Sequence, residues 1–193
     1  MRTTVLTLLA LGSVSYVVSQ DAEKPAPGKL VLLIAAKELT VTQGQQLQIT
    51  ATVSNQGKMP ITLVLPGDGS ESGWRSPVIG WSTIKVEKEA AKHPDTPPLY
   101  RGGRCGNINP LKKEEVFVLA PGESKRLNEW LGSPQLAVPG TYSIVFFYAN
   151  EPDRKWRGLP LGQHDPEAMK QVQNSHKCLL VSNELRVVVK PKD

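Results

Sequence analysis

The sequence contains few of the residues that usually mark a catalytic or metal centre. Only two cysteines and three histidines occur among its 193 residues, and no histidine or carboxylate pair has the spacing of metal ligands. The run "GSESG" lacks the central serine of a nucleophile elbow, because Glu71 occupies that place. A complete catalytic set is therefore missing, and we expect a protein that is not an enzyme.

The sequence also lacks a block of basic residues. Its net charge is +5, but lysines and arginines are interspersed with acids in "KVEKEAAK", "LKKEE" and "EPDRKWRG". Nucleic-acid-binding domains usually show a basic stripe or a recognisable motif. The charge pattern therefore indicates a mixed, solvated surface and no nucleic-acid partner.

No apolar run is long enough for a membrane-spanning helix. The longest covers residues 5–18, follows Arg2 and ends before the polar stretch "SQDAEKPAPGK", whereas a spanning helix needs about 20 apolar residues. This arrangement is typical of a secretory signal peptide. We expect a signal peptide over 1–19, a linker over 20–28, one domain over 29–193, and export to the periplasm, the cell surface or the medium, with no stable membrane span after cleavage.

The two cysteines, Cys105 and Cys178, both follow the predicted signal peptide. In an oxidising compartment such a pair favours a disulfide, which would stabilise the fold by roughly 4 kcal/mol in the chain-entropy account. The alternative is a thiol nucleophile with His176 as its base, but a single histidine nearby in the sequence is weak support. We expect the disulfide.

Most of the remaining sequence predicts β-strands. Leu47, Ile49, Ala51 and Val53 alternate with polar residues, which is the period-two pattern of a strand with one buried face. Further strands are expected in "LVLLIAA", "ITLVLP", "PVIGWSTIKVE", "EEVFVL", "SKRLNEW", "TYSIVFFYAN" and "CLLVSNELRVVV". The apolar parity of "PVIGWSTIKVE" shifts along its length, which predicts a β-bulge near residues 80–82. The last segment is expected to be one extended terminal strand.

The segment "TYSIVFFYAN" is apolar on both faces, which places it in the middle of a sheet that is covered on both sides. One short helix is expected in "HDPEAMKQVQNSH", over the end or edge of a sheet. Asp165 would cap it, Pro166 suits its first position, and Met169 and Val172 would face inward.

This pattern predicts an all-β fold, an immunoglobulin-like antiparallel β-sandwich with long loop insertions and one short helix. The segments "VSNQGKMPITLVL", "APGES", "VPGTYSIVFFY" and "SNELRVVV" resemble the landmarks of bacterial extracytoplasmic immunoglobulin-like domains, and also the small sandwich of the BsuPI type of proteinase inhibitor. The resemblance covers about residues 30–149 and the last strand. It implies that Tyr142 stands at a tyrosine corner, where its hydroxyl would bond to the backbone.

The loops contain the candidate sites. "GDGSESGWRSP" holds Asp68 and Glu71, but Ile79 occupies the twelfth position from Asp68, which excludes an EF-hand and leaves only a weak, looser calcium or metal site. A turn with no ligand is the simpler interpretation. Trp81 and Trp130 are expected to pack. The better binding candidates are aromatic and basic loop residues: Trp74, Arg75, Arg154, Lys155, Trp156 and Arg157.

Together these features predict an exported, non-enzymatic module that binds a protein or a glycan through the loops at 66–77, 100–110 and 150–165, with no cofactor. Two alternatives remain. One is a proteinase inhibitor that uses the Cys105 loop. The other is a metal-dependent hydrolase built on Asp68, Glu71, Asp153 and His164.

Overall fold

The computed structural model describes residues 30–67, 76–87, 92–97, 111–153 and 165–192. Ten β-strands, one α-helix and one short 3₁₀ helix occur in these residues. In chain order they are β1 (Leu30–Ala36), β2 (Thr40–Thr42), β3 (Ile49–Asn55), β4 (Ile61–Val64), β5 (Val78–Val86), η1 (Lys113–Glu115), β6 (Val116–Leu119), β7 (Ser124–Arg126), β8 (Gly140–Asn150), α1 (Pro166–Gln173), β9 (Cys178–Val181) and β10 (Leu185–Lys190).

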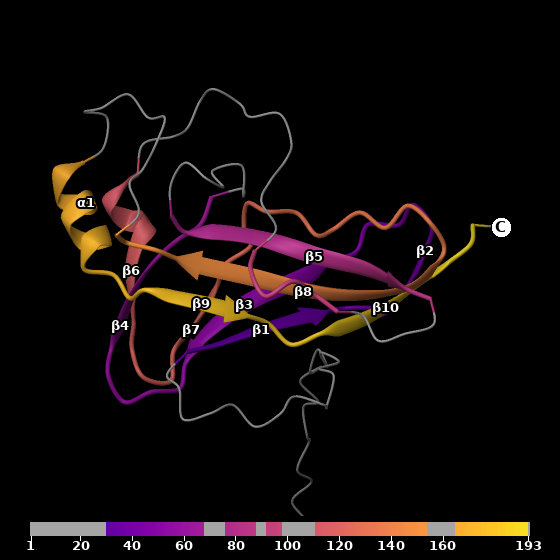
Figure 1. Ribbon diagram of the computed structural model, residues 1–193, viewed down its shortest axis with the longest axis horizontal. Helices are drawn as coiled ribbons and strands as arrows, with labels where there is room; N and C mark the ends of the chain where they lie inside the picture. Colours follow the sequence, from indigo (N-terminus) through magenta and orange to yellow (C-terminus); the bar gives the residue numbers. More distant parts are fainter. Residues whose placement is uncertain (1–29, 68–75, 88–91, 98–110, 154–164, 193) are drawn as a thin grey trace, which may run out of the picture.

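The strands form two main sheets and a smaller pair (Figure 1). One sheet has the order β1-β3-β7, and the other has the order β2-β10-β8-β5, with β9 also paired to β8. Strands β4 and β6 pair with each other. All pairings are antiparallel except that of β2 with β10. The predicted all-β, antiparallel sandwich is confirmed, whereas its immunoglobulin-like type remains a prediction.

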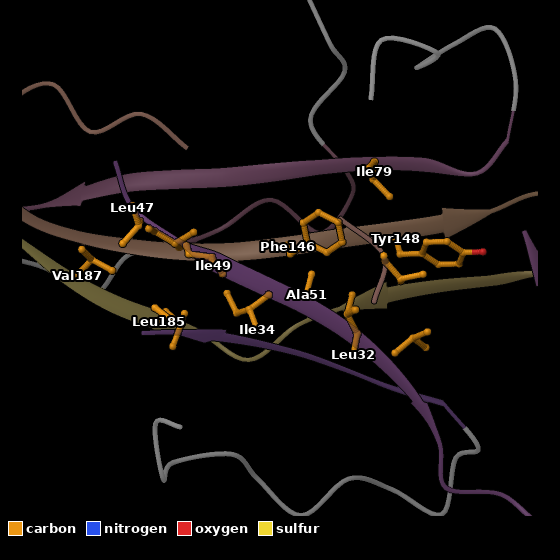
Figure 2. Close-up of a cluster of buried hydrophobic side chains, with 14 of the residues drawn as sticks. Leu32, Ile34, Leu47, Ile49, Ala51, Ile79, Phe146, Tyr148, Leu185 and Val187 are labelled. Carbon is orange, nitrogen blue, oxygen red and sulfur yellow. The ribbon is translucent and has the colours of Figure 1, made fainter. Parts of the chain in front are cut away.

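The core lies between the two sheets. Alternate residues of β3 and β10 point into it, as the period-two pattern requires, and Figure 2 shows Ile34 and Ala51 of one sheet facing Phe146 and Leu185 of the other. These four side chains are fully buried. Burying a side chain of this kind contributes about 1.5–3 kcal/mol for the larger residues, so the core is the main source of stability.

Strand β8 is the centre of the larger sheet, as its two apolar faces predict. It pairs with β5 along one edge, and with β10 and β9 one after the other along its opposite edge. Its inward residues, such as Phe146 and Tyr148, belong to the core, and its outward residues Val145 and Phe147 are buried as well. The sheet is therefore covered on both sides at β8.

The predicted bulge in β5 is wrong. Strand β5 pairs with β8 in one unbroken register from Val78 opposite Ala149 to Val86 opposite Thr141. Ile79 and Trp81 contact the core, whereas Ser82 is buried on the other face, where His93 covers it. The pattern of apolar residues along β5 changes because each face of the strand is buried over a different part of its length. The strand therefore contains no bulge residue.

The predicted single terminal strand is also wrong, because residues 182–184 divide it into β9 and β10. The Ser182 hydroxyl accepts a hydrogen bond from the Phe146 amide at 2.9 Å. The Asn183 side chain accepts from the Ile34 amide at 2.8 Å and donates to the Ile34 carbonyl at 3.2 Å. These side-chain hydrogen bonds take the place of backbone hydrogen bonds between strands. Because Ser182 bonds to β8 and Asn183 bonds to β1, they link the two sheets at this break.

The predicted helix α1 is confirmed. The Asp165 carboxylate accepts a hydrogen bond from the Glu167 amide at 2.9 Å, which caps the helix. Val172 is buried and Met169 is partly buried, against Val64 and Leu111. The helix therefore lies over the end of the β4–β6 pair (Figure 1). In the part of the chain that the structure describes, no helix is long and apolar enough to cross a membrane.

Candidate functional site

Most of the predicted site residues lie outside the described part of the chain. These are Asp68, Glu71, Trp74, Arg75, Cys105, Arg154, Lys155, Trp156, Arg157 and His164. Their assignments remain predictions. The structure does place Tyr142, Asp153 and Cys178, and it reveals two features that the sequence did not indicate: a groove beside β9 and a histidine clamp on β5 and β8.

Tyr142 has the hydrogen bond that its resemblance to a tyrosine corner implies. Its hydroxyl donates to the carbonyl of Val138, four residues upstream, at 2.8 Å. The bond fixes the loop that enters β8, while the ring is buried in the core. This position is structural and takes no part in the groove described next.

A groove with a volume of about 520 Å³ lies at one end of the larger sheet. Val78, Ala149 and Leu179 are paired with one another across β5, β8 and β9, so they form a continuous apolar row in it. Thr96 and Pro97 of the 92–97 segment line it as well. The remaining described lining residues are Asn150, Glu151, Lys177 and Cys178. The size and the apolar lining with a few polar groups are typical of a ligand site.

A buried hydrogen-bond network fixes the polar end of this groove. The Asn150 side chain donates to the Ser175 hydroxyl at 2.8 Å and to the His176 carbonyl at 2.9 Å, and it accepts from the Ser76 hydroxyl at 3.2 Å. Ser76 also accepts from the Glu151 amide at 2.6 Å. The network ties the start of β5, the end of β8 and the turn after α1 into one rigid unit.

One ion pair stands beside the groove. Lys177 Nζ lies 3.4 Å from Asp153 Oδ2, and both side chains are largely exposed. An exposed pair of this kind contributes about 0–1 kcal/mol to stability, so it can rearrange at low cost. Lys177 is therefore able to contact a ligand. Asp153, which the hydrolase alternative uses, pairs with this lysine.

The predicted disulfide does not appear. Cys178 is a free thiol, and Cys105 lies outside the described residues. Cys178 stands opposite Asn150 in the β8–β9 pair and packs against the core. This desolvation raises the pKa of the Cys178 thiol to about 11, although a hydrogen bond with the Asn150 backbone partly opposes the rise. A thiol protonated at neutral pH is a poor nucleophile, which also argues against the alternative of a cysteine enzyme.

His93 clamps two neighbouring strands on the outer face of the larger sheet. Its Nδ1 lies 2.9 Å from the Ser82 hydroxyl of β5, and its Nε2 lies 2.7 Å from the Ser143 hydroxyl of β8. These are the distances of a serine nucleophile and its base. Ser143 is completely buried, however, and Ser82 is nearly so, so no substrate reaches either hydroxyl, and the arrangement is a structural tie.

The tryptophan predictions were half right. Trp81 packs on Phe146 with ring centroids 4.6 Å apart and donates from Nε1 to the Gly132 carbonyl at 2.8 Å. Trp130, also expected to pack, is 75% exposed. The bonds of Asn128 to β3 and of Trp81 to Gly132 hold this loop from both sides, so Trp130 points away from the core.

Among the residues with described positions, no group of three or more histidine, cysteine, aspartate or glutamate side chains is arranged to hold a metal ion. The weak metal candidates Asp68 and Glu71 lie in the segment that follows residue 67 and remain untested predictions. Comparisons of the chain with protein-family models, with curated proteins and with solved structures found no match.

Proposed function

We propose that this chain is an exported, non-enzymatic binding module that recognises a protein partner by accepting an apolar side chain of that partner in the groove beside β9. The observation that carries the proposal is the groove itself, because its apolar row is paired across three strands of a rigid sheet. A rigid site loses little entropy when it binds.

The lining favours a protein over a glycan. Val78, Ala149, Leu179 and Pro97 present aliphatic surface, which suits a leucine-like or aromatic anchor, whereas a sugar needs more hydrogen-bonding groups. Lys177 at the edge can add a contact to an acidic residue of the partner. Export follows from the signal peptide expected over residues 1–19.

The test uses Leu179→Glu, which places a charge in the groove. Leu179 is 48% exposed, so the protein should fold normally. The matched control is Val118→Glu on β6, where the valine is 60% exposed and does not line the groove. Both variants are first compared with the wild type by denaturant unfolding. An environment-sensitive apolar probe, dansyl-leucinamide, is then titrated into each protein.

We expect the probe to bind the wild type and Val118→Glu alike, and to bind Leu179→Glu at least tenfold more weakly. Affinity capture from an envelope and secreted-protein extract, with the same three proteins as bait, then identifies a partner that is lost only with Leu179→Glu. Equal probe binding by all three proteins would contradict the proposal. Retention of a protease would favour the proteinase inhibitor, and retention of glycans alone would favour the glycan alternative.

A further inference from the structure

The 92–97 segment forms part of the groove, and His93 attaches this segment to the sheet. Thr96 and Pro97 line the groove, and they stand three and four residues after His93 in the sequence. His93 reaches both β5 and β8 through its two ring nitrogens. A titratable side chain therefore attaches this part of the groove to the sheet.

The hydrogen bonds of His93 suit a neutral ring. A neutral imidazole has one donor nitrogen and one acceptor nitrogen, so one of the two serine hydroxyls accepts from it and the other donates to it. Protonation makes both nitrogens donors, and the serine that had donated must turn its proton elsewhere. Ser143 is completely buried and Ser82 nearly so, where a hydroxyl without a partner is costly.

Among the described residues, the charged groups that face His93 come from β10 and from the segment before it. Glu184 faces it, and Arg186, which stands opposite Ser143 in the β8–β10 register, lies 3.2 Å from Glu184. Lys85 of β5 has the opposite parity to Ser82 and faces away, and Lys92 and Asp95 of the segment itself are exposed. The Glu184 carboxylate is thus shared with Arg186 and only partly compensates a charge on His93.

We propose that His93 is an acid-sensitive latch for the groove, which holds Thr96 and Pro97 in place when its ring is neutral and releases them when the ring is protonated. The latch concerns the shape of the groove, and it regulates the proposed function only if the groove binds the partner.

The direction of the effect follows from linkage. Desolvation lowers the pKa of His93 from its ordinary value near 6.5, and Glu184 opposes part of that shift. The folded state favours the neutral form of the His93 ring. The stability that this ring contributes is therefore fully present above the pKa that the group has in the unfolded chain. That contribution decreases as the pH falls below about 6.5 and through the lower folded value. The latch is therefore closed at pH 7.5 and loosened at acid pH.

The Cys178 thiol packs against the core and lies on the face of the sheet opposite to the apolar row of the groove. A cysteine in place of Ala149, which lines the groove and is 9% exposed, therefore reports on the latch. Its labelling by 4,4′-dithiodipyridine is measured at pH 7.5 and pH 5.5 in the full chain with Ala149→Cys, Cys105→Ser and Cys178→Ser, which is the parent protein. The same measurement is made with His93→Gln added, which cannot titrate, so the ratio of the two rates at each pH removes the pH dependence of the thiol itself. His176→Gln is the matched control, because the His176 side chain is exposed and, within the described part of the chain, its hydrogen bonds come from its backbone.

The quantity compared is the labelling rate of the parent divided by that of the His93→Gln variant. We expect this ratio to rise at least threefold from pH 7.5 to pH 5.5. The His176→Gln variant, divided by the His93→Gln variant in the same way, should show the same rise. His93→Ala should label faster than the parent at pH 7.5, by about tenfold, since both hydrogen bonds that attach the segment to the sheet are lost. Circular dichroism confirms that each variant is folded under the labelling conditions.

A ratio that is constant between the two pH values would overturn the latch, as would His93→Ala labelling at the parent rate. Dansyl-leucinamide binding separates this result from the proposed function. Loss of pH-dependent labelling with intact probe binding refutes the latch alone. Failure of the probe to bind, with pH-dependent labelling retained, refutes the groove as a ligand site and leaves the latch standing.

Discussion

At the scale of single residues, the structure depends on polar side chains that no local pattern identifies. Tyr148 lies in the segment predicted as a strand that is apolar on both faces, yet its buried hydroxyl donates to the Val64 carbonyl at 2.8 Å and accepts from the Val64 amide at 3.3 Å. Sequence alternation shows which face of a strand a residue occupies. It cannot show which backbone group of another sheet lies opposite.

Tyr148→Phe should therefore lower the free energy of unfolding by about 1–3 kcal/mol, because two backbone groups of Val64 lose a buried partner and water cannot replace it. Tyr142→Phe is the comparison, since its hydroxyl bond to Val138 is only partly buried, and we expect it to cost about 1 kcal/mol or less. Urea unfolding at pH 7 measures both. Equal effects of the two substitutions would count against the Val64 bonds as a stabilising feature.

The Cys178 thiol should react slowly. With its pKa at about 11, the thiolate is on the order of a hundredfold less populated at pH 8 than in an ordinary cysteine. Iodoacetamide labelling of the reduced Cys105→Ser chain should be slower by about this factor in the folded state than in concentrated urea. Equal rates in the two states would show that the thiol is neither desolvated nor held by β9.

At the scale of elements, strands could be predicted from their apolar residues, and errors arose where side chains replace backbone bonds. The period-two pattern located β3, and apolar runs located β1, β4, β5 and β8. Residues 182–184 carry no Pro or Gly that would signal the end of a strand. The break between β9 and β10 depends instead on the bonds of Asn183 to Ile34 in the other sheet. Tertiary contacts of this kind are absent from the local sequence.

Asn128 performs a similar role at the end of the short strand β7. Its amide accepts from the Ala51 amide at 2.9 Å and donates to the Ile49 carbonyl at 2.8 Å, in a buried position. Asn128→Ala leaves both groups of β3 without these bonds, so we expect a loss of about 3 kcal/mol of unfolding free energy. Ser133→Ala, which removes one less buried bond to Ile49, should cost about 1 kcal/mol. Guanidinium unfolding measures the loss for both variants. A loss for Asn128→Ala no larger than that for Ser133→Ala would refute this role of Asn128.

At the scale of the whole molecule, the all-β class follows from strand number and turn residues, but the pairing order does not. Strand β10 joins β2 and β8, although the residues of β2 that pair with it lie 148 positions earlier in the chain, as Thr40 does from Val188. No spacing rule predicts that pair. The groove has the same origin, since Val78, Ala149 and Leu179 meet only when β5, β8 and β9 are aligned. Most residues of the loops that we expected to bind lie outside the described part of the chain, but Asn150 and Glu151, at the start of the predicted 150–165 loop, line the groove.

The pairing order gives β10 a decisive role in stability. Leu185, Val187 and Val189 are all buried, and at about 1.5–3 kcal/mol each their removal costs an amount similar to the whole stability of a typical domain, about 5–15 kcal/mol. The chain truncated after Glu184 should therefore show no cooperative unfolding transition by circular dichroism. Truncation after Lys190 removes only residues 191–193 and should leave the denaturant midpoint unchanged. If the shorter chain unfolded cooperatively at the full-length midpoint, the larger sheet would not depend on its terminal strand, and β2 would need another partner.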